Sequence, residues 1–370
     1  MKVLHIYKTY FPEDFTGIPR VIHAIAEGTA SLGVESHVFA LTKGIASAEP
    51  VPVDSHVVHQ VRRDFQVAST DFAFGAFSRF RKLASEFDIL HYHFPWPTGD
   101  FLHLLAAPDR PAIVTYHSDV VRQKWLSAVY APMRDIFLSR MDRIVATSPN
   151  YAASSPVLQR FRDKVQIIPI GIGPRPCVDV DRLEHWRRTF GEEFFLFVGS
   201  DRYYKGLDFL IEAATMTQLP VVIVGEVDEG LVARLPPNAV AVGRVSDPDK
   251  EALLDLCLAF VFPSHLRSEA FGVALLEAAR AGKPMISCEI GTGTSFVNVD
   301  GQTGLVVPPR DASSLISAMW ALAHDRDDVA RMGANAHERF EAHFTQREMA
   351  RSYDRIYKGL AVIDTLRQRP

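Results

Sequence analysis

The chain has 370 residues, 47% hydrophobic and 23% charged, which suits a globular protein and favours two domains, or three, over one. Its formal net charge of −4 gives no global positive field, which argues against a nucleic-acid-binding protein. Three widely spaced cysteines, Cys177, Cys257 and Cys288, argue against a disulfide framework and against zinc or redox pairs of the C-x-x-C kind.

The first residues predict a strand and not a targeting segment. A short apolar run at 3–7 follows Lys2, and Pro12, Glu13 and Asp14 then interrupt it, unlike the longer apolar stretch of a signal peptide. No apolar run in the sequence approaches the roughly 20 residues that span a bilayer. Together with the cysteine usage, this pattern predicts a cytoplasmic protein.

The first half of the chain alternates short apolar runs with helical patterns. Strands are predicted at 2–7, 35–41, 89–93, 112–116, 143–147 and 165–169. Helices are predicted between them, among others at 18–32, 75–86 and 120–141. This alternation is typical of a doubly wound parallel sheet.

The second half repeats the alternation. Strands are predicted at 194–199, 221–225, 239–242, 258–262, 285–288 and 304–307, and helices at 207–215, 248–256, 272–281 and 313–323. A Gly- and Pro-rich segment, 169–176, suits a hinge. We therefore predict two Rossmann-like α/β domains facing a cleft, 1–172 and 173–344, with a C-terminal helix at 345–370 that returns to the first domain.

Ligands of such sheets bind at the carboxyl ends of the strands, so residues there are candidates for a site. In the first half, Gly17 opens a helix and would let a phosphate or sugar approach the backbone, although a simple turn explains it as well. His117 follows the strand at 112–116 and could donate to a sugar hydroxyl, or be a structural histidine paired with Asp119.

Two further histidines, His91 and His93, lie at the end of a predicted strand. Their spacing allows a metal-binding pair, but no third ligand is evident in the sequence, and we favour roles in lining the cleft or contacting an acceptor. The short D-x-D segment of Asp179 and Asp181 follows the hinge and no strand, so we assign it to the linker.

In the second half, one loop carries two cations and a later one two carboxylates. Arg202 and Lys205 follow the strand at 194–199 and could neutralise a leaving diphosphate, or be solvated surface cations. Glu269 and Glu277 bracket the turn before a helix predicted to start near Phe271, whose free N–H groups favour anions and hydroxyl oxygens. A plain strand, turn and helix with two solvated glutamates is the alternative.

Two weaker segments complete the candidate set. The loop at 242–246, with Arg244 and Val245, could contact a nucleobase through its backbone. The run 291–296 begins as G-x-G but lacks the last glycine of a dinucleotide fingerprint, so we interpret it as a sugar or phosphate loop and not as an NAD site.

Taken together, these residues resemble glycosyltransferase family 4, retaining enzymes of the GT-B fold. The resemblance runs along nearly the whole chain through Gly17, His117, the loop of Arg202 and Lys205, and the paired glutamates, and it ends with the family-typical segment 300–308. The family's arginine usually follows the strand-end glycine directly, where this chain has Ser200. Further runs, such as 91–97, 117–124 and 146–151, are similar to bacterial mannosyl- and rhamnosyltransferases of O-antigen assembly.

The resemblance implies a transfer of mannose or rhamnose from a GDP-sugar to a polyprenyl-linked or oligosaccharide acceptor, without a metal cofactor. It implies catalytic roles for His117, Arg202, Lys205 and Glu269. The donor would be held by the residues Gly17, Arg202, Lys205, Arg244, Val245, Phe271, Gly272, Val273 and Glu277. The sequence does not decide guanine against uracil, so a UDP-sugar donor stays open, as do a GT-B epimerase or phosphorylase and a non-catalytic sugar-nucleotide-binding subunit.

A membrane contact on the acceptor side is a further possibility. Aromatic and cationic residues alternate at Phe72, Phe74, Phe77, Arg79, Phe80, Arg81 and Lys82, and the segment 122–126 adds more cations. Such a face could rest on the inner surface of an anionic membrane as a peripheral contact. The alternative, which we favour, is that the phenylalanines belong to the core and the cations are solvated.

Overall fold

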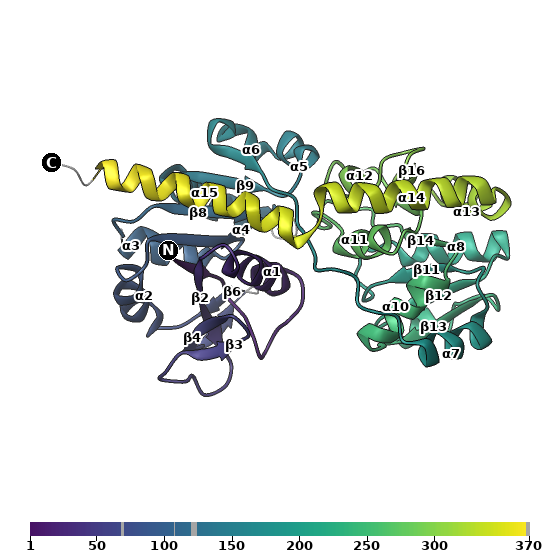
Figure 1. Cartoon of the computed structure of the whole chain (residues 1–370), viewed down its shortest axis with the longest axis horizontal. Coiled ribbons are helices and arrows are strands. Elements are labelled where there is room, and N and C mark those ends of the chain that lie inside the picture. The colour runs from purple at the N-terminus through teal and green to yellow at the C-terminus, as the bar shows by residue number, and fades with distance from the viewer. Residues whose placement is uncertain (68–69, 107, 120–123, 368–370) are drawn as a thin grey trace. The chain divides into compact units, whose positions relative to one another are not determined.

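The computed structural model describes residues 1–67, 70–106, 108–119 and 124–367 (Figure 1). The chain forms two compact units, of which the first comprises Met1–Gly173 and Gln346–Pro370 and the second Pro174–Thr345. The sequence-based boundary at 172/173 and the predicted return of the C-terminal helix match this division to within one residue. No helix among the described residues is long and apolar enough to cross a membrane.

The first unit is built on an eight-stranded sheet in the order β10-β9-β8-β7-β1-β2-β4-β3, in which only β3 pairs antiparallel. Its strands are β1 (Lys2–Ile6), β2 (Glu35–Thr42), β3 (Val51–Val53), β4 (His56–Arg62), β7 (Ile89–Phe94), β8 (Ala112–Tyr116), β9 (Arg143–Ala146) and β10 (Val165–Ile167). A separate hairpin joins β5 (Phe65–Val67) and β6 (Thr70–Phe72).

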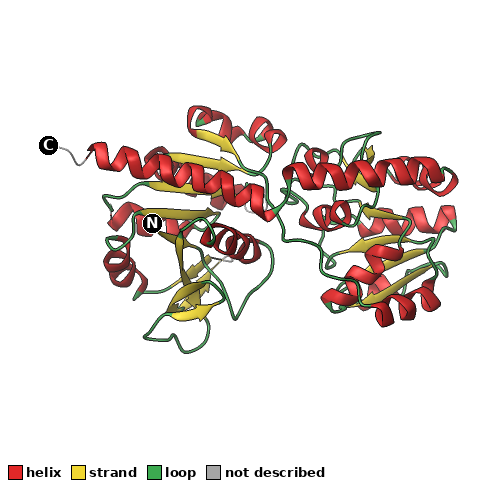
Figure 2. Ribbon diagram, viewed as in Figure 1, coloured by secondary structure: helices red, strands yellow, loops and turns green. Residues whose placement is uncertain are grey.

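The helices of the first unit flank this sheet (Figure 2). They are α1 (Ile18–Ala30), α2 (Ala76–Ala84), α3 (Pro97–Ala106), α4 (Lys124–Arg140), α5 (Pro149–Ser154), α6 (Pro156–Arg160) and α15 (Gln346–Arg367), with a 3-10 turn at Arg162–Lys164. Pro19 occupies the first turn of α1, where its missing N–H costs nothing.

The C-terminal helix α15 docks on α1 and on β7. A side chain at Gly28 in α1 would lie 2.7 Å from Cβ of Ala350, so only glycine permits the helices to approach this closely. Tyr353 and Tyr357 are buried and hydrogen-bond Thr115 and His91. The helix predicted from the polar tail is therefore part of the first unit's core.

The second unit has a six-stranded parallel sheet in the order β13-β12-β11-β14-β15-β16. The strands are β11 (Phe195–Val198), β12 (Val221–Val224), β13 (Ala239–Gly243), β14 (Ala259–Phe262), β15 (Met285–Cys288) and β16 (Gly304–Val307). The helices are α7 (Val180–Phe190), α8 (Leu207–Thr217), α9 (Glu229–Val232), α10 (Asp247–Leu256), α11 (Val273–Arg280), α12 (Thr294–Val297), α13 (Ala312–His324) and α14 (Arg326–His343).

Several predicted elements differ from the observed ones. The helix predicted at 120–141 is observed at Lys124–Arg140, and residues 120–123 lie outside the described residues. The assignment of Asp179 to a linker is wrong, because its carboxylate accepts from the N–H groups of Asp181 and Arg182 and caps α7. The helix predicted to start near Phe271 starts at Val273, after Gly272 in a left-handed conformation.

Candidate functional site

In the second unit, the loops after β11 and β14 are fastened together at the carboxyl edge of the sheet. Gly206 has φ +74°, and a Cβ there would lie 2.1 Å from the carbonyl oxygen of Pro263. The N–H of His265 donates to the carbonyl of Tyr204 at 2.9 Å. Both contacts require a glycine at 206, because any side chain would push the loops apart.

This fastening brings Lys205 to Glu269. The Lys205 ammonium lies 2.5 Å from a carboxylate oxygen of Glu269, and the two side chains are only 14% and 13% exposed. The same nitrogen lies 4.5 Å from the ring centroid of Phe262, the last residue of β14. Because an aromatic face and a carboxylate both attract the ammonium, Lys205 is held as a fixed cation with little freedom.

Arg202 is placed differently from Lys205, although both lie on the predicted loop. Its side chain is exposed, and no ion pair of its guanidinium occurs within the described part of the chain. The loop next to it is tied down by Tyr203, whose hydroxyl lies 3.0 Å from that of Ser268. The pairing of the two cations around one diphosphate thus stays a prediction.

The turn before α11 is built from close backbone contacts. Gly272, with φ +87°, precedes the first helical residue, Val273, and Phe271 is buried beside it. The N–H of Gly293 donates to the carbonyl of Ala270 at 2.9 Å, and a Cβ at Gly293 would collide with the ring of Phe271 at 2.5 Å. The run 291–296 and the helix start therefore form one packed rim.

Glu277 lies in the second turn of α11 and is buried, not solvated. Its carboxylate oxygen lies 2.8 Å from the ammonium of Lys250 on α10, and both side chains are 10% exposed. Burial alone lowers the pKa of Lys250, but Glu277 and Asp247 outweigh it and raise that pKa above its ordinary value. Lys250 was not among the predicted site residues, because nothing in its spacing links it to a glutamate 27 residues later.

The predicted nucleobase loop, 242–246, is partly exposed. Arg244 pairs with Glu226 at 2.9 Å, with side chains 74% and 65% exposed, and Val245 is half-buried. An exposed pair of this kind exchanges readily for another partner, because it is worth about 0–1 kcal/mol. Arg244 is thus able to turn to a ligand at little cost.

In the first unit, Gly17 caps α1 with φ +57°, and a Cβ there would meet nothing within 4 Å. The positive φ explains the glycine, and the open space around it leaves the backbone accessible. His117 follows β8 and is buried, with its backbone N–H bonded to the carbonyl of Phe94. Burial lowers the pKa of His117 to about 3, so its ring is neutral at neutral pH.

His117 lies at one end of a buried row of histidines. Its Nε2 is 3.0 Å from Nδ1 of His93, whose Nε2 is 3.1 Å from Nδ1 of His5. His91 stacks on His93 at 4.3 Å between ring centroids but bonds instead to Thr115 and Tyr357, each at 2.7 Å. The preferred roles of His91 and His93 in lining a cleft are wrong, because both rings lie in the core.

The structural alternative for His117, a pair with Asp119, differs from the observed bonds. The Asp119 carboxylate accepts from the hydroxyls of Tyr116 and Ser155 at 2.8 Å each, and its N–H donates to Tyr151. His117 instead uses His93. Asp119 thus anchors α5 and α6 to the end of β8.

A third histidine, which the sequence did not indicate, joins the predicted pair. Ring nitrogens of His5, His91 and His93 lie within 4.8 Å of one another, the spacing of a metal site. Both nitrogens of His91 and of His93 already have hydrogen-bond partners, however, and a divalent ion would have to displace them. The donor set also carries no negative charge to offset a buried dication.

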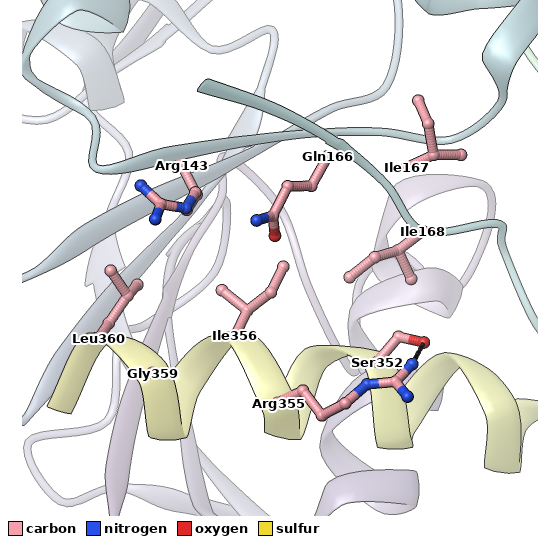
Figure 3. Close-up of a pocket in the computed structure, with 9 residues that line it drawn as sticks. All are labelled: Arg143, Gln166, Ile167, Ile168, Ser352, Arg355, Ile356, Gly359 and Leu360. Atoms are coloured by element: carbon pink, nitrogen blue, oxygen red, sulfur yellow. Dashed lines mark hydrogen bonds between the residues drawn. The ribbon is translucent and has the colours of Figure 1, made fainter. Parts of the chain in front are cut away.

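A separate cavity of about 370 Å³ lies between β10 and α15 of the first unit (Figure 3). It is lined by Arg143, Gln166, Ile167, Ile168, Ser352, Arg355, Ile356, Gly359 and Leu360. Arg355 is turned back on its own helix toward Ser352, at 3.0 Å. None of the predicted site residues lines it.

The predicted membrane face is divided by the structure. Phe80 is fully buried, and the ring of Phe72 stacks on that of Phe65 with 5.0 Å between the ring centroids. Phe74, by contrast, is 82% exposed. Arg81 and Lys82 are exposed, and Arg79 donates to the carbonyl of Ala48 at 3.0 Å. In the segment 122–126, residues 122 and 123 and the side chains of 124–126 lie outside the described residues.

Comparisons with known proteins match both units. The model of "Glycosyltransferase Family 4" matches residues 15–175, and that of "Glycosyl transferases group 1" matches residues 184–339. The chain is 46% identical over 367 residues to O-antigen chain mannosyltransferase C of Escherichia coli, covering 97% of this chain and 99% of that protein. It is 48% identical over 361 residues to D-rhamnosyltransferase WbpZ of Pseudomonas aeruginosa, covering 93% and 92%.

Among solved structures, sucrose-phosphate synthase from Thermosynechococcus elongatus superposes with a TM-score of 0.80 at 20% identity. That match covers 98% of this chain and 99% of the other. At this identity the likeness establishes the fold alone.

Proposed function

The chain belongs to glycosyltransferase family 4 and is a glycosyltransferase of the GT-B fold, and from this premise we propose that it transfers mannose or rhamnose from a GDP-sugar with retention of configuration. The acceptor is a polyprenyl-linked or oligosaccharide chain of a surface polysaccharide. The two relatives named a mannosyl- and a rhamnosyltransferase, each nearly half identical over almost the whole chain, support this choice of sugar.

The observation that carries the proposal is the fixed cation Lys205 beside Glu269 at the carboxyl edge of the second sheet. A departing nucleoside diphosphate needs positive charge placed before the bond breaks, and a restrained ammonium supplies it without reorganisation. Arg202, exposed on the same loop, adds a second cation that is free to move to a phosphate. We therefore expect transfer to need no metal ion and to survive chelation by EDTA.

The other residues take roles that follow from their chemistry. Glu277 accepts from the ribose hydroxyls, the backbone at Arg244 and Val245 contacts the base, and the N–H groups at Phe271, Gly272 and Val273 hold sugar hydroxyls beside Glu269. The backbone at Gly17 approaches the donor, and His117 donates to a hydroxyl of the transferred sugar.

For the reaction we propose the front-side route. The acceptor oxygen bonds to the anomeric carbon on the face from which the diphosphate leaves, the bond from that carbon to the phosphate oxygen breaks, and the acceptor proton passes to a phosphate oxygen. The configuration at the anomeric carbon is then retained. Lys205 and Arg202 stabilise the charge that grows on the diphosphate.

The test is a panel of GDP- and UDP-sugars with a synthetic polyprenyl-diphosphate-linked acceptor. We expect a new glycosidic linkage from GDP-mannose or GDP-rhamnose only, with the donor's anomeric configuration shown by NMR. Turnover with UDP-sugars alone would replace the donor assignment. An altered free nucleotide sugar without a new linkage would indicate an epimerase, and nucleotide binding without any turnover would indicate a non-catalytic subunit.

A further inference from the structure

Three histidines on neighbouring strands form a single hydrogen-bonded row that ends at His117. His5 on β1, His93 on β7 and His117 after β8 are joined by two imidazole–imidazole bonds, of 3.1 Å and 3.0 Å. The rings stack nearly parallel, at 5.4 Å and 5.3 Å between centroids. Each bond joins Nδ1 of one ring to Nε2 of the next in the same sense along the row.

A row of neutral imidazoles can carry its protons in only two ways. Each neutral ring has one N–H donor and one bare nitrogen acceptor, so fixing one ring fixes all three. Burial lowers the pKa of His5 and His117 to about 3 and that of His93 well below its ordinary value, so the three rings are neutral at neutral pH. Either every Nδ1 carries the proton, or every Nε2 does.

The buried end of the row decides between the two arrangements. Nε2 of His5 is buried and has no hydrogen-bond partner among the residues that the structure describes. A buried N–H without an acceptor is rarer in proteins than an unused acceptor. The proton of His5 therefore belongs on Nδ1, where it donates to His93, and the Nδ1 proton of His93 in turn donates to Nε2 of His117.

We propose that His93, backed by His5, is a positioning residue that holds His117 in the tautomer with its proton on Nδ1. Within the described part of the chain no residue bonds to that nitrogen, so it is the donor presented to a ligand. The inference rests on the proposed role of His117 as a donor to the transferred sugar. The row transfers no proton to the substrate; it only determines which nitrogen of His117 carries the proton.

The direct test is the tautomeric state of the histidines in the whole protein, read from long-range proton–nitrogen NMR spectra of 15N-histidine-labelled enzyme at neutral pH. We expect His5, His93 and His117 all to carry the proton on Nδ1, although Nε2 is the commoner site in a free neutral imidazole. A proton on Nε2 of His117 in the unaltered enzyme would overturn the proposal.

Two variants at one position separate positioning from packing. His93→Leu removes the donor to His117, so the His117 proton should move to Nε2 and kcat should fall about tenfold or more, with the affinity for GDP unchanged. His93→Asn keeps an N–H near the place of Nδ1 and should restore the His117 tautomer and part of kcat. If His117 keeps its proton on Nδ1 in His93→Leu, His93 does not set it.

His91 supplies the matched control. It is equally buried and stacks on His93, but its bonds go to Thr115 and Tyr357. His91→Phe should lower the stability and leave the His117 tautomer in place; an equal change in that tautomer would mean that packing alone sets it. Should His93→Leu fail to fold, the unaltered enzyme and His93→Asn still decide the question.

Two other outcomes are distinguishable. Stoichiometric zinc in the purified enzyme, with the His5 and His93 signals shifted by the metal, would overturn the row as described. If NMR shows the expected tautomers but the protein transfers no sugar, the hydrogen-bonded row stands and the proposed function is wrong.

Discussion

The ammonium of Lys205 lies 2.5 Å from the carboxylate of Glu269, although 64 residues separate them in the chain. The close approach of Gly206 to Pro263 creates this contact by fastening the loop of one strand to the loop of the next. The cation is therefore fixed before any ligand arrives. Such preorganised charge is what a departing diphosphate requires.

The first prediction concerns that cation. Lys205→Met should reduce kcat roughly 30- to 1,000-fold, because the charge on the leaving diphosphate loses its partner. This reduction corresponds to a loss of about 2–4 kcal/mol of transition-state stabilisation. Transfer from GDP-mannose measures the effect. The control is Arg326→Met, which breaks a pair with Glu193 at the same 2.5 Å distance but with side chains 51% and 73% exposed. Equal rates in the two variants would remove Lys205 from the reaction.

The second prediction concerns the buried pair of Lys250 and Glu277. Lys250→Met leaves a carboxylate buried without its cation and should lower the free energy of unfolding by about 3–5 kcal/mol. Arg234→Met is the control, since Arg234 lies at the same 2.8 Å from Asp208 but the two side chains are 57% and 71% exposed, and about 0–1 kcal/mol is expected there. Urea denaturation compares them, and equal losses would mean that burial of the pair has no energetic consequence.

Glu277 itself gives a third prediction, on binding. Glu277→Gln keeps the shape of the side chain but loses the charge that strengthens hydrogen bonds from the ribose hydroxyls, so the Kd for GDP should rise about tenfold. Titration calorimetry with GDP measures it, and guanine without its ribose should bind both forms equally weakly. A Kd unchanged by the substitution would place the ribose elsewhere.

The fourth prediction tests the fastening of the loops. Gly206→Ala places a methyl group 2.1 Å from a carbonyl oxygen at φ +74°, so it should displace Lys205 and lower both stability and kcat. Gly33→Ala is the matched control, because it has φ +83° but nothing within 4 Å, and only about 1–2 kcal/mol of backbone strain is expected. If the two substitutions have the same effect on kcat, the contact with Pro263 does not position Lys205.

Whether a helix or strand could be predicted from the sequence depends on how clear its local pattern is. The strands β8, β15 and β16 are observed at the predicted bounds, because each is a short, largely apolar run between clear breaks. The helix α7 was missed: its apolar residues Leu183, Trp186 and Phe190 recur at helical spacing, but charged residues stand between them and none of its residues is buried. The strand β4 was missed although it is mostly buried, because two histidines and a glutamine interrupt its apolar run.

The candidate site shows the same limit. Lys205 and Glu269 were predicted as members of one site, and the structure pairs them. Lys250 and His5 were not, because a partner of Glu277 or of His93 is chosen by packing between elements far apart in the chain. His5 in particular lies within an apolar run that reads only as a strand. Tertiary contacts of this kind carry no local signature.

The last prediction concerns pH and the buried histidines of the first unit. The folded-state pKa of His5 and of His117 is about 3, and burial holds those of His91 and His93 well below the ordinary value of 6.5. Below pH 6.5 these histidines therefore bind protons in the unfolded chain but stay neutral in the folded one. The stabilisation is complete above that pH and is lost progressively as the pH falls toward 3.

The size follows from the same linkage. Between pH 7 and pH 5 each histidine that stays neutral in the folded protein should remove about 2 kcal/mol from the free energy of unfolding. Asp100 acts in the opposite sense, because burial raises its pKa to about 8 and it keeps a proton that the unfolded chain releases. Variants at single histidines isolate one contribution from this sum.

Hydrogen exchange at the amides of β1 and β7 measures the effect within the first unit. Between pH 7 and pH 5 the free energy of opening should fall by about 2 kcal/mol less in His5→Phe than in the unaltered protein, since one proton fewer is taken up on opening. His185→Phe, at an exposed position on α7, should leave the loss unchanged. If the pH dependence is identical in the unaltered protein and in His5→Phe, His5 is already protonated in the folded core. That result would also contradict the row of neutral histidines that ends at His117.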